Sequence, residues 1–237
     1  MNKIAILLIT IFLFSEGLSA QEINVNRKKI EATRVTTSPE IDGDLNDSAW
    51  KNVPIAKDFS MMRPTNGDKE PASHKTEVKL VYDDNAIYVS AKMLAPDPSK
   101  IPAEFNNRDN IGNADFFMLM VNPNDDGQNP TMFIVTASGV QVDSKVSNGN
   151  EDYNWNAVWE SAHTLTDYGW TVEMKIPYRA LRFANEDVQS WGVNFHREVR
   201  NLNARFTWNH IDNNSGRWTQ YDGLVENFRN IKPPTRL

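Results

Sequence analysis

The chain has 237 residues, of which 40% are hydrophobic, 10% aromatic and 24% charged, which is typical of a globular protein and not of a disordered, collagenous or coiled-coil chain. Its 25 Lys and Arg residues against 31 Asp and Glu residues give a net charge of −6, which disfavours non-specific binding to nucleic acid. Cysteine is absent, and this excludes disulfides, cysteine nucleophiles, thiolate zinc sites and iron–sulfur clusters.

The first twenty residues have the layout of a secretory signal peptide. Lys3 gives a short positive start, residues 4–14 are almost entirely apolar, and small residues follow up to Ala20. The apolar run is about half the roughly 20 residues that a membrane-spanning helix needs. We therefore predict a signal peptide over 1–20 and export to the periplasm, the outer membrane or the extracellular medium.

The rest of the chain is patterned for strands. After Ala20 no segment keeps apolar residues at helical spacing for three turns, whereas apolar–polar alternation is common. The expected strands, in chain order, are 77–82, 86–91, 115–121, 131–138, 140–145, 170–176, 191–199 and 206–210. Turns at 83–85 and at Gly139 join two pairs of these into hairpins. This pattern predicts an all-β, two-sheet antiparallel β-sandwich of the immunoglobulin or jelly-roll kind.

The remaining segments complete the expected organisation. One helical turn is expected at 47–50 and another at 177–181, and 61–75, 96–112 and 147–156 are irregular. Residues 21–34 form a lead segment, 35–230 the sandwich and 231–237 a truncated linker. The tryptophans expected in the core are Trp50, Trp159, Trp170, Trp191 and Trp208.

Motifs of catalysis are missing from the sequence. It contains no Gly-rich dinucleotide fingerprint, no P-loop, no Gly-x-Ser-x-Gly elbow and no His-Glu-x-x-His pair. A glycosidase would need two carboxylates across a cleft, and the acidic residues offer no pair that the sequence singles out. We therefore expect a binding protein and not an enzyme.

Two short segments are rich in oxygen-bearing side chains. Asp42, Asp44 and Asp47 could hold Ca²⁺, because this cation prefers carboxylate and carbonyl oxygens. The alternative is a turn, in which Asp and Asn bond their own backbone and Gly43 takes a positive φ, and the turn is the favoured interpretation. Residues 122–127 allow the same two interpretations, with the same preference.

Some aromatic residues lie in polar surroundings. Tyr153 and Trp155 lie among acids and amides, and Trp218 follows Asn214 and Arg217 in a polar loop. Sugars stack their C–H faces on flat rings and bond their hydroxyls to amides, acids and Arg, so these tryptophans could form a saccharide platform. Alternatively, they fold back to cap the end of the sandwich, and the sequence favours neither interpretation.

The order of several blocks resembles that of family 9 carbohydrate-binding modules. The opening block is 41–50 (Ile-Asp-Gly-Asp-Leu-Asn-Asp-Ser-Ala-Trp), and the later blocks are 76–93, 115–122, 169–177, 191–195 and 208–223. Details at 108–109, 139–143 and 177–183 resemble a subgroup of large exported bacterial proteins, in which such a module precedes a predicted outer-membrane β-barrel. The resemblance covers roughly residues 35–230.

This resemblance implies a β-sandwich that holds a sugar between two tryptophans, often with structural Ca²⁺. Trp218 matches one of these tryptophans, but residues 111–113 (Ile-Gly-Asn) stand where the other is expected. Met118 and Ile134 stand where the resemblance implies an acidic and a basic ligand. If sugar binds differently, the candidate contacts are Trp218, Trp155, Arg108, Asp109, Asn214 and Arg217.

Three hypotheses follow. The first is a secreted, non-catalytic, monomeric module that binds a saccharide by stacking and hydrogen bonds, in support of carbohydrate catabolism. The second is an accessory module of an outer-membrane β-barrel partner, with no sugar ligand. The third is a haem-binding sandwich, for which the candidate ligands are Met118, Met120, His196 and His210.

Overall fold

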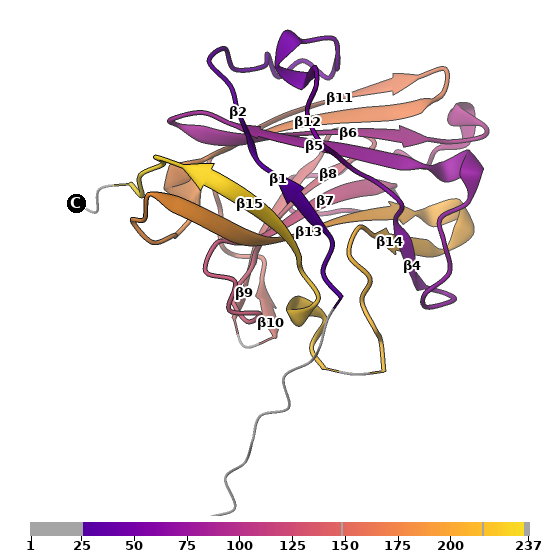
Figure 1. The fold of residues 1–237 in the computed structure, drawn as a ribbon. Helices are drawn as coiled ribbons and strands as arrows, with labels where there is room; N and C mark the ends of the chain where they lie inside the picture. Colours follow the sequence, from indigo (N-terminus) through magenta and orange to yellow (C-terminus); the bar gives the residue numbers. More distant parts are fainter. Residues whose placement is uncertain (1–25, 148, 215, 235–237) are drawn as a thin grey trace, which may run out of the picture.

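Two β-sheets packed face to face make up the fold (Figure 1). The computed structural model describes residues 26–147, 149–214 and 216–234, so the predicted signal peptide lies outside the described residues. In the described part of the chain, no helix is long and apolar enough to cross a membrane. The same residues contain no α-helix, only single 3₁₀ turns, which agrees with the all-β prediction.

Sheet A contains, in the described chain, nine strands. Its main path runs β1-β15-β13-β7-β8-β9-β10, with β14 on β13 and β4 on β14. The bounds are β1 Lys29–Glu31, β4 Ser60–Arg63, β7 Phe116–Asn122, β8 Thr131–Thr136, β9 Gln141–Ser147, β10 Asn150–Asp152, β13 Val188–Val199, β14 Ala204–Thr207 and β15 Gly223–Arg229.

Sheet B has six strands in the same part of the chain, in the order β11-β12-β6-β5-β2, with β3 also on β5. The bounds are β2 Thr33–Arg34, β3 Ile55–Ala56, β5 Thr76–Tyr82, β6 Ala86–Leu94, β11 Glu160–Thr166 and β12 Gly169–Pro177. Two pairs, β1–β15 and β2–β5, are parallel, which departs from a purely antiparallel sandwich. Both arise because the N-terminal segment runs along one edge of each sheet in turn.

The predicted hairpins are confirmed. β5 and β6 pair antiparallel around a turn in which the Asp83 carboxylate accepts from the backbone N–H of Asn85 and Ala86. β8 and β9 pair around Gly139, whose φ of 82° requires glycine or a strained residue. The predicted strand 206–210 was misplaced, because β14 ends at Thr207 and leaves Trp208 and His210 beyond it.

The main core lies between the sheets. It is built from the inward residues of both, among them Phe117, Phe133, Trp191 and Phe195 of sheet A and Trp170 of sheet B. All five tryptophans expected in the core are buried. Burial of this many large apolar side chains supplies the main driving force for folding.

A second layer covers the outer face of sheet B. Trp50, at the end of the 3₁₀ turn Ser48–Trp50, packs there against Val81 and Tyr88. The buried Glu173 carboxylate accepts from Trp50 Nε1 at 2.7 Å and from the backbone N–H of Gly43 at 2.9 Å. The 41–50 block is thus clamped onto the sheet by a residue more than 120 positions later in the chain.

Candidate functional site

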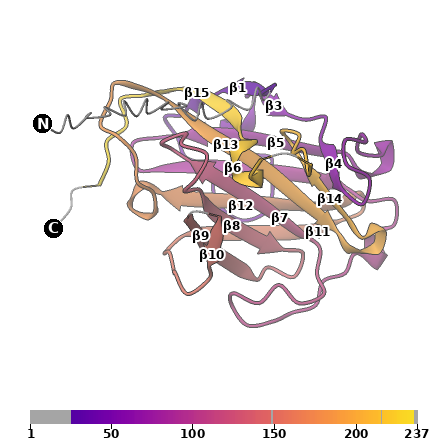
Figure 2. The ribbon, with the colours of Figure 1, turned by 90° about the horizontal axis from the view of Figure 1, so that it is seen from below.

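The outer face of sheet A carries the candidate site. Successive residues of a strand point to opposite faces, so β13 sends Trp191, Phe195 and Arg197 inward and Asn194 and His196 outward. Figure 2 views the molecule from below, with the strands of sheet A in front. The cross-strand register places His196 beside Met118, and Met118 beside Ile134, across three neighbouring strands.

A cavity of about 340 Å³ opens above this row. Its floor is apolar, and Ile111 and Trp218 pack against the same cluster of buried side chains. The volume lies within the usual range for small-ligand sites. The residues around it are Met62, Ile111, Phe116, Met118, Met132, Ile134, Glu151, Tyr153, His196, Arg205 and Trp218.

His196 is the unusual polar group of this cavity. Its side chain is 1% exposed, and within the described chain neither ring nitrogen has a hydrogen-bond partner. Burial lowers the pKa of His196 to about 3, and the nearby Arg205 guanidinium contributes to this, so the ring is neutral at pH 7. A neutral imidazole offers one donor and one acceptor, and leaving both unpaired is costly unless a ligand uses them.

The rim of the cavity carries the charged groups. Arg205 stacks over the Phe116 ring at 5.2 Å and donates to the Glu198 carboxylate at 2.9 Å. Tyr153 donates its hydroxyl proton to Glu151, and burial together with this carboxylate raises the pKa of Tyr153. The rim can therefore offer both donors and acceptors to a polar ligand, whereas the floor offers them only through His196 among the described residues.

Arg108 and Asp109 hold a different part of the molecule together. The Arg108 guanidinium pairs with the buried Asp143 carboxylate and donates to the Ala157 carbonyl. Asp143 also accepts from Trp159 Nε1 at 3.1 Å, and Asp109 accepts from the Asp143 backbone N–H. These contacts fix the chain after β9, and neither Arg108 nor Asp109 lines the cavity of Trp218.

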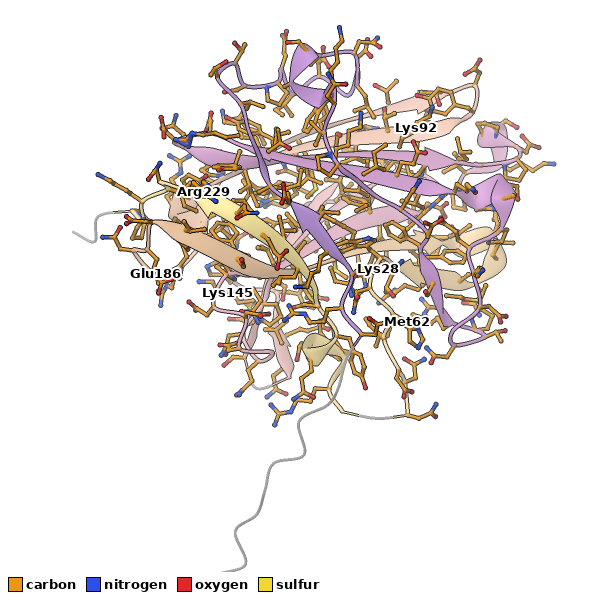
Figure 3. The ribbon with its side chains drawn as sticks, viewed as in Figure 1. Lys28, Met62, Lys92, Lys145, Glu186 and Arg229 are labelled. Carbon is orange, nitrogen blue, oxygen red and sulfur yellow. The ribbon has the colours of Figure 1, made fainter. Side chains whose placement is uncertain are left out.

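Trp155 lies in another pocket, lined also by Lys145, Arg179 and Arg182. The Lys145 ammonium covers one face of the Trp155 ring at 4.3 Å, and Phe133 meets the ring edge-on. Lys145 of this pocket and Met62 of the cavity lie well apart in Figure 3. The structure therefore does not bring Trp155 and Trp218 into one site.

The other candidate residues lie outside the cavity. Asn214 and Arg217 are exposed in the loop before Trp218 and do not line it. Asp42 accepts from the Asp44 backbone N–H at 2.8 Å and Asp47 from that of Glu40 at 2.8 Å, as in a turn. Across the described residues, no three Asp, Glu or His side chains are grouped so that they could hold a metal ion.

A comparison with protein families gives a match over residues 41–220 to the carbohydrate family 9 binding domain-like family. The chain belongs to this family. The 41–50 block that opens the match is the segment clamped onto sheet B by Glu173. No curated protein matches the chain significantly.

Solved structures share the fold. A family 9 module from Caldicellulosiruptor kristjanssonii in complex with cellotriose is 20% identical with a TM-score of 0.60, covering 88% of this chain and 95% of its own. Its glucose complex gives 19% identity and a TM-score of 0.58, covering 88% and 97%. A Bacteroides uniformis protein described as carbohydrate-binding gives 12% identity and a TM-score of 0.65, covering 84% and 99%.

The four positions that the sequence resemblance assigns to the sugar clamp lie in one cavity. Ile111, Met118, Ile134 and Trp218 all line it, although 107 positions separate the first from the last. The structure therefore brings together the four positions that the resemblance assigns to a sugar, and three of these positions carry apolar residues. Phe116, Met132 and Glu151 also line the cavity and were not predicted, because only the pairing of β7 with β8 and of β9 with β10 brings them there.

Proposed function

We propose that this protein is a non-catalytic carbohydrate-binding module whose saccharide enters the cavity above β7, β8 and β13 and stacks on Trp218. The observation that carries the proposal is the convergence of Ile111, Met118, Ile134 and Trp218 on one cavity in a family 9 fold. An aromatic ring beside a cavity with a polar rim matches the needs of a sugar, which has an apolar face and a polar edge.

The floor of the cavity narrows the class of sugar. Phe116, Met118, Met132 and Ile134 cannot bond hydroxyl groups, and burying an unpaired hydroxyl against them costs about 1–3 kcal/mol. We therefore infer that the buried end of the ligand carries an apolar group, such as a deoxy, O-methyl or O-acetyl substituent. Among the described residues that line the cavity, His196 is the buried polar one, and it would form a hydrogen bond with a single hydroxyl or carbonyl of the ligand.

The test is a titration of intrinsic tryptophan fluorescence, supported by calorimetry. Glucose and cellotriose are compared with 6-deoxy, O-methyl and O-acetyl sugars. We expect saturable binding with preference for the substituted sugars, and a loss of affinity of about fivefold or more in Trp218→Ala, given that aromatic stacking contributes about 1 kcal/mol or more. Trp155→Ala, in the other pocket, is the matched control and keeps the affinity.

Other outcomes would reject parts of the proposal. Tighter binding of unsubstituted cellotriose would reject the apolar substituent while keeping the sugar site. A flat response to every sugar by a folded protein would reject sugar binding and favour an envelope partner. Export is proposed on the signal-peptide pattern, and an N-terminus other than Gln21 in protein recovered from the envelope would contradict the cleavage site.

A second candidate function is haem binding, favoured by the adjacency of His196 and Met118 in an apolar cavity. Both ring nitrogens of His196 are free of hydrogen bonds to the described residues, as an axial ligand requires. Haem added to the purified protein should then give a Soret band that Met118→Leu shifts. A colourless protein after haem addition would reject this candidate.

A further inference from the structure

The pocket of Trp155, which shares no lining residue with the cavity of Trp218, collects positive charge. It has a volume of about 340 Å³, and Lys145 of β9 forms one side of it (Figure 3). Arg179 and Arg182 line it from the turn that follows β12. Among the described residues that line the pocket there is no Asp or Glu. The chain as a whole carries a net charge of −6, so this local excess of cations is not a result of composition.

The two arginines of the pocket have no partners in the protein. Within the described part of the chain, neither Arg179 nor Arg182 forms a hydrogen bond or an ion pair. Six other arginines do pair with a carboxylate, namely Arg27, Arg34, Arg63, Arg108, Arg200 and Arg205. A guanidinium group has five donors in a planar fork that fits the oxygens of a carboxylate, sulfate or phosphate. Both forks of this pocket are therefore available to a ligand.

Lys145 has a positive neighbour and lacks a negative one. β10 places Asp152 opposite Lys145, but the Asp152 carboxylate accepts from the Asn154 backbone N–H at 3.0 Å and does not line the pocket. Burial lowers the pKa of Lys145, and repulsion from Arg182 adds to this shift. An anion between these two side chains would supply the countercharge and offset the repulsion.

The walls of the pocket are fixed by hydrogen bonds to residues outside it. On one side, the backbone N–H of Ala157 donates to the buried Asp143 carboxylate at 2.6 Å. On the other side, the backbone N–H of Tyr178 donates to the Asn85 carbonyl at 2.9 Å, and its hydroxyl donates to the Asp83 carbonyl at 2.8 Å. Both segments are held in place without a ligand, which reduces the conformational cost of binding one.

We propose that this pocket binds a small organic anion. An oxyanion group of the ligand, either a carboxylate or a sulfate or phosphate ester, lies between the Lys145 ammonium and the two guanidinium groups. The carbon skeleton lies against Trp155 and Leu181, which form part of the same wall. An inorganic ion would leave this apolar wall and most of the volume unused. An acidic sugar has the required chemistry; that the ligand is a sugar rests on the proposed function, whereas the binding of an anion does not.

The experiment uses the mature protein and four ligands built on one ring: glucose, glucuronate, glucose 6-sulfate and glucose 6-phosphate. Acetate, inorganic sulfate and inorganic phosphate are titrated as simple anions, and binding is followed by calorimetry and tryptophan fluorescence. We expect at least one charged sugar to bind at least about tenfold more tightly than both glucose and its simple anion, since hydrogen bonds between charged groups are the strong ones. The preferred sugar identifies the oxyanion, and its affinity should fall as NaCl is raised.

Two substitutions locate the binding site. Arg182→Gln removes one guanidinium at an exposed position, so the fold should be kept, and it should weaken binding of the preferred charged sugar by at least about tenfold. Arg229→Gln removes the same charge at an exposed position outside the pocket, and this matched control should change the affinity by less than about twofold. Trp218→Ala should also keep the affinity, because Trp218 lines the other cavity.

Four results would overturn the proposal. They are no binding of any charged sugar, binding of glucose as tight as that of the charged sugars, binding of the simple anions as tight as that of the charged sugars, and a loss of affinity in Trp218→Ala that Arg182→Gln does not show. Binding of uncharged sugars that Trp218→Ala removes belongs to the proposed function. The two proposals therefore fail or succeed separately.

Discussion

The two faces of β13 treat adjacent polar residues in opposite ways. Arg197 points into the core and donates to the carbonyls of His74 and Leu94, each at 2.7 Å. His196, one residue earlier, points outward into the cavity and bonds none of the described residues. Both side chains are about 1% exposed. Burial alone therefore does not distinguish the two residues. Arg197 has hydrogen-bond partners in the protein and is a structural group, whereas His196 has none among the described residues and is a candidate binding group.

The largest expected effect comes from removing the inner group. Arg197→Met leaves two buried carbonyls unpaired, and it removes the cation that favours ionisation of Glu70 and Asp115. We expect the free energy of unfolding to fall by about 3–5 kcal/mol in urea. Arg229→Met, at an exposed position, is the control and should change it by less than about 0.5 kcal/mol. If the free energy of unfolding of Arg197→Met fell by as little as that of Arg229→Met, Arg197 would not be the structural group that its hydrogen bonds indicate.

His196, the outward-pointing residue, should make the stability of the protein depend on pH. The pKa of His196 is about 3 when folded, against 6.5 in the unfolded chain, so its stabilising contribution is complete above pH 6.5 and is lost as pH falls towards 3. Relative to His196→Phe, the protein should lose about 1.4 kcal/mol of unfolding free energy per pH unit, or about 2 kcal/mol at pH 5.

The measured quantity is the difference in unfolding free energy between the unaltered chain and His196→Phe. This difference is needed because other titrating groups change the stability with pH in the opposite direction. Burial raises the pKa of Glu70 to about 7 and that of Asp115 to about 6, so both favour folding as pH falls. Parallel urea unfolding curves at pH 7, 6 and 5 cancel these contributions. A constant difference across this range would mean that His196 has an ordinary pKa and a partner.

Arg108 also tests the distinction between structural groups and binding groups, because the sequence suggests that it contacts a sugar whereas the structure gives it protein partners. Arg108→Ala leaves the buried Asp143 carboxylate with Trp159 Nε1 and the Ala157 N–H as its remaining partners among the described residues. We expect a loss of about 1–2 kcal/mol in stability, reduced by the partial exposure of the guanidinium, with no change in sugar affinity. Unchanged stability together with a tenfold loss of affinity would instead make Arg108 a ligand residue.

The smallest effect is expected at the second pocket. Lys145→Gln removes the ammonium from the face of the Trp155 ring, and we expect a loss of about 0.5–1 kcal/mol in thermal unfolding. Titrations of this variant with uncharged sugars should match those of the unaltered chain. An increase in affinity would show that Lys145 had been covering a stacking surface on Trp155.

Much of the fold was predictable from the sequence. The apolar patterns identified the long strands β5 to β9, β12 and β13, and Asp83 and Gly139 marked turns whose chemistry is local. They did not identify β11, β15 or the short strands β1 to β4 and β10. The structure brings only some of the predicted site residues together. Trp218 lines one cavity with Ile111, Met118 and Ile134, whereas Arg108, Asp109 and Trp155 lie outside that cavity. Binding roles for the predicted residues, and Ca²⁺ at Asp42, Asp44 and Asp47, stay predictions.

By itself the sequence determined the class of fold, the hairpins and the buried tryptophans, because these depend on side-chain periodicity and on bonds between residues a few positions apart. It could not distinguish His196 from Arg197, or Arg182 from an arginine that pairs with a carboxylate. Whether a polar side chain has a partner depends on residues brought together from distant parts of the chain, as when Lys145, Arg179 and Arg182 meet in one pocket. Only the packing of the two sheets decided that, because hydrogen bonding and desolvation act over a few ångströms in space and not along the chain.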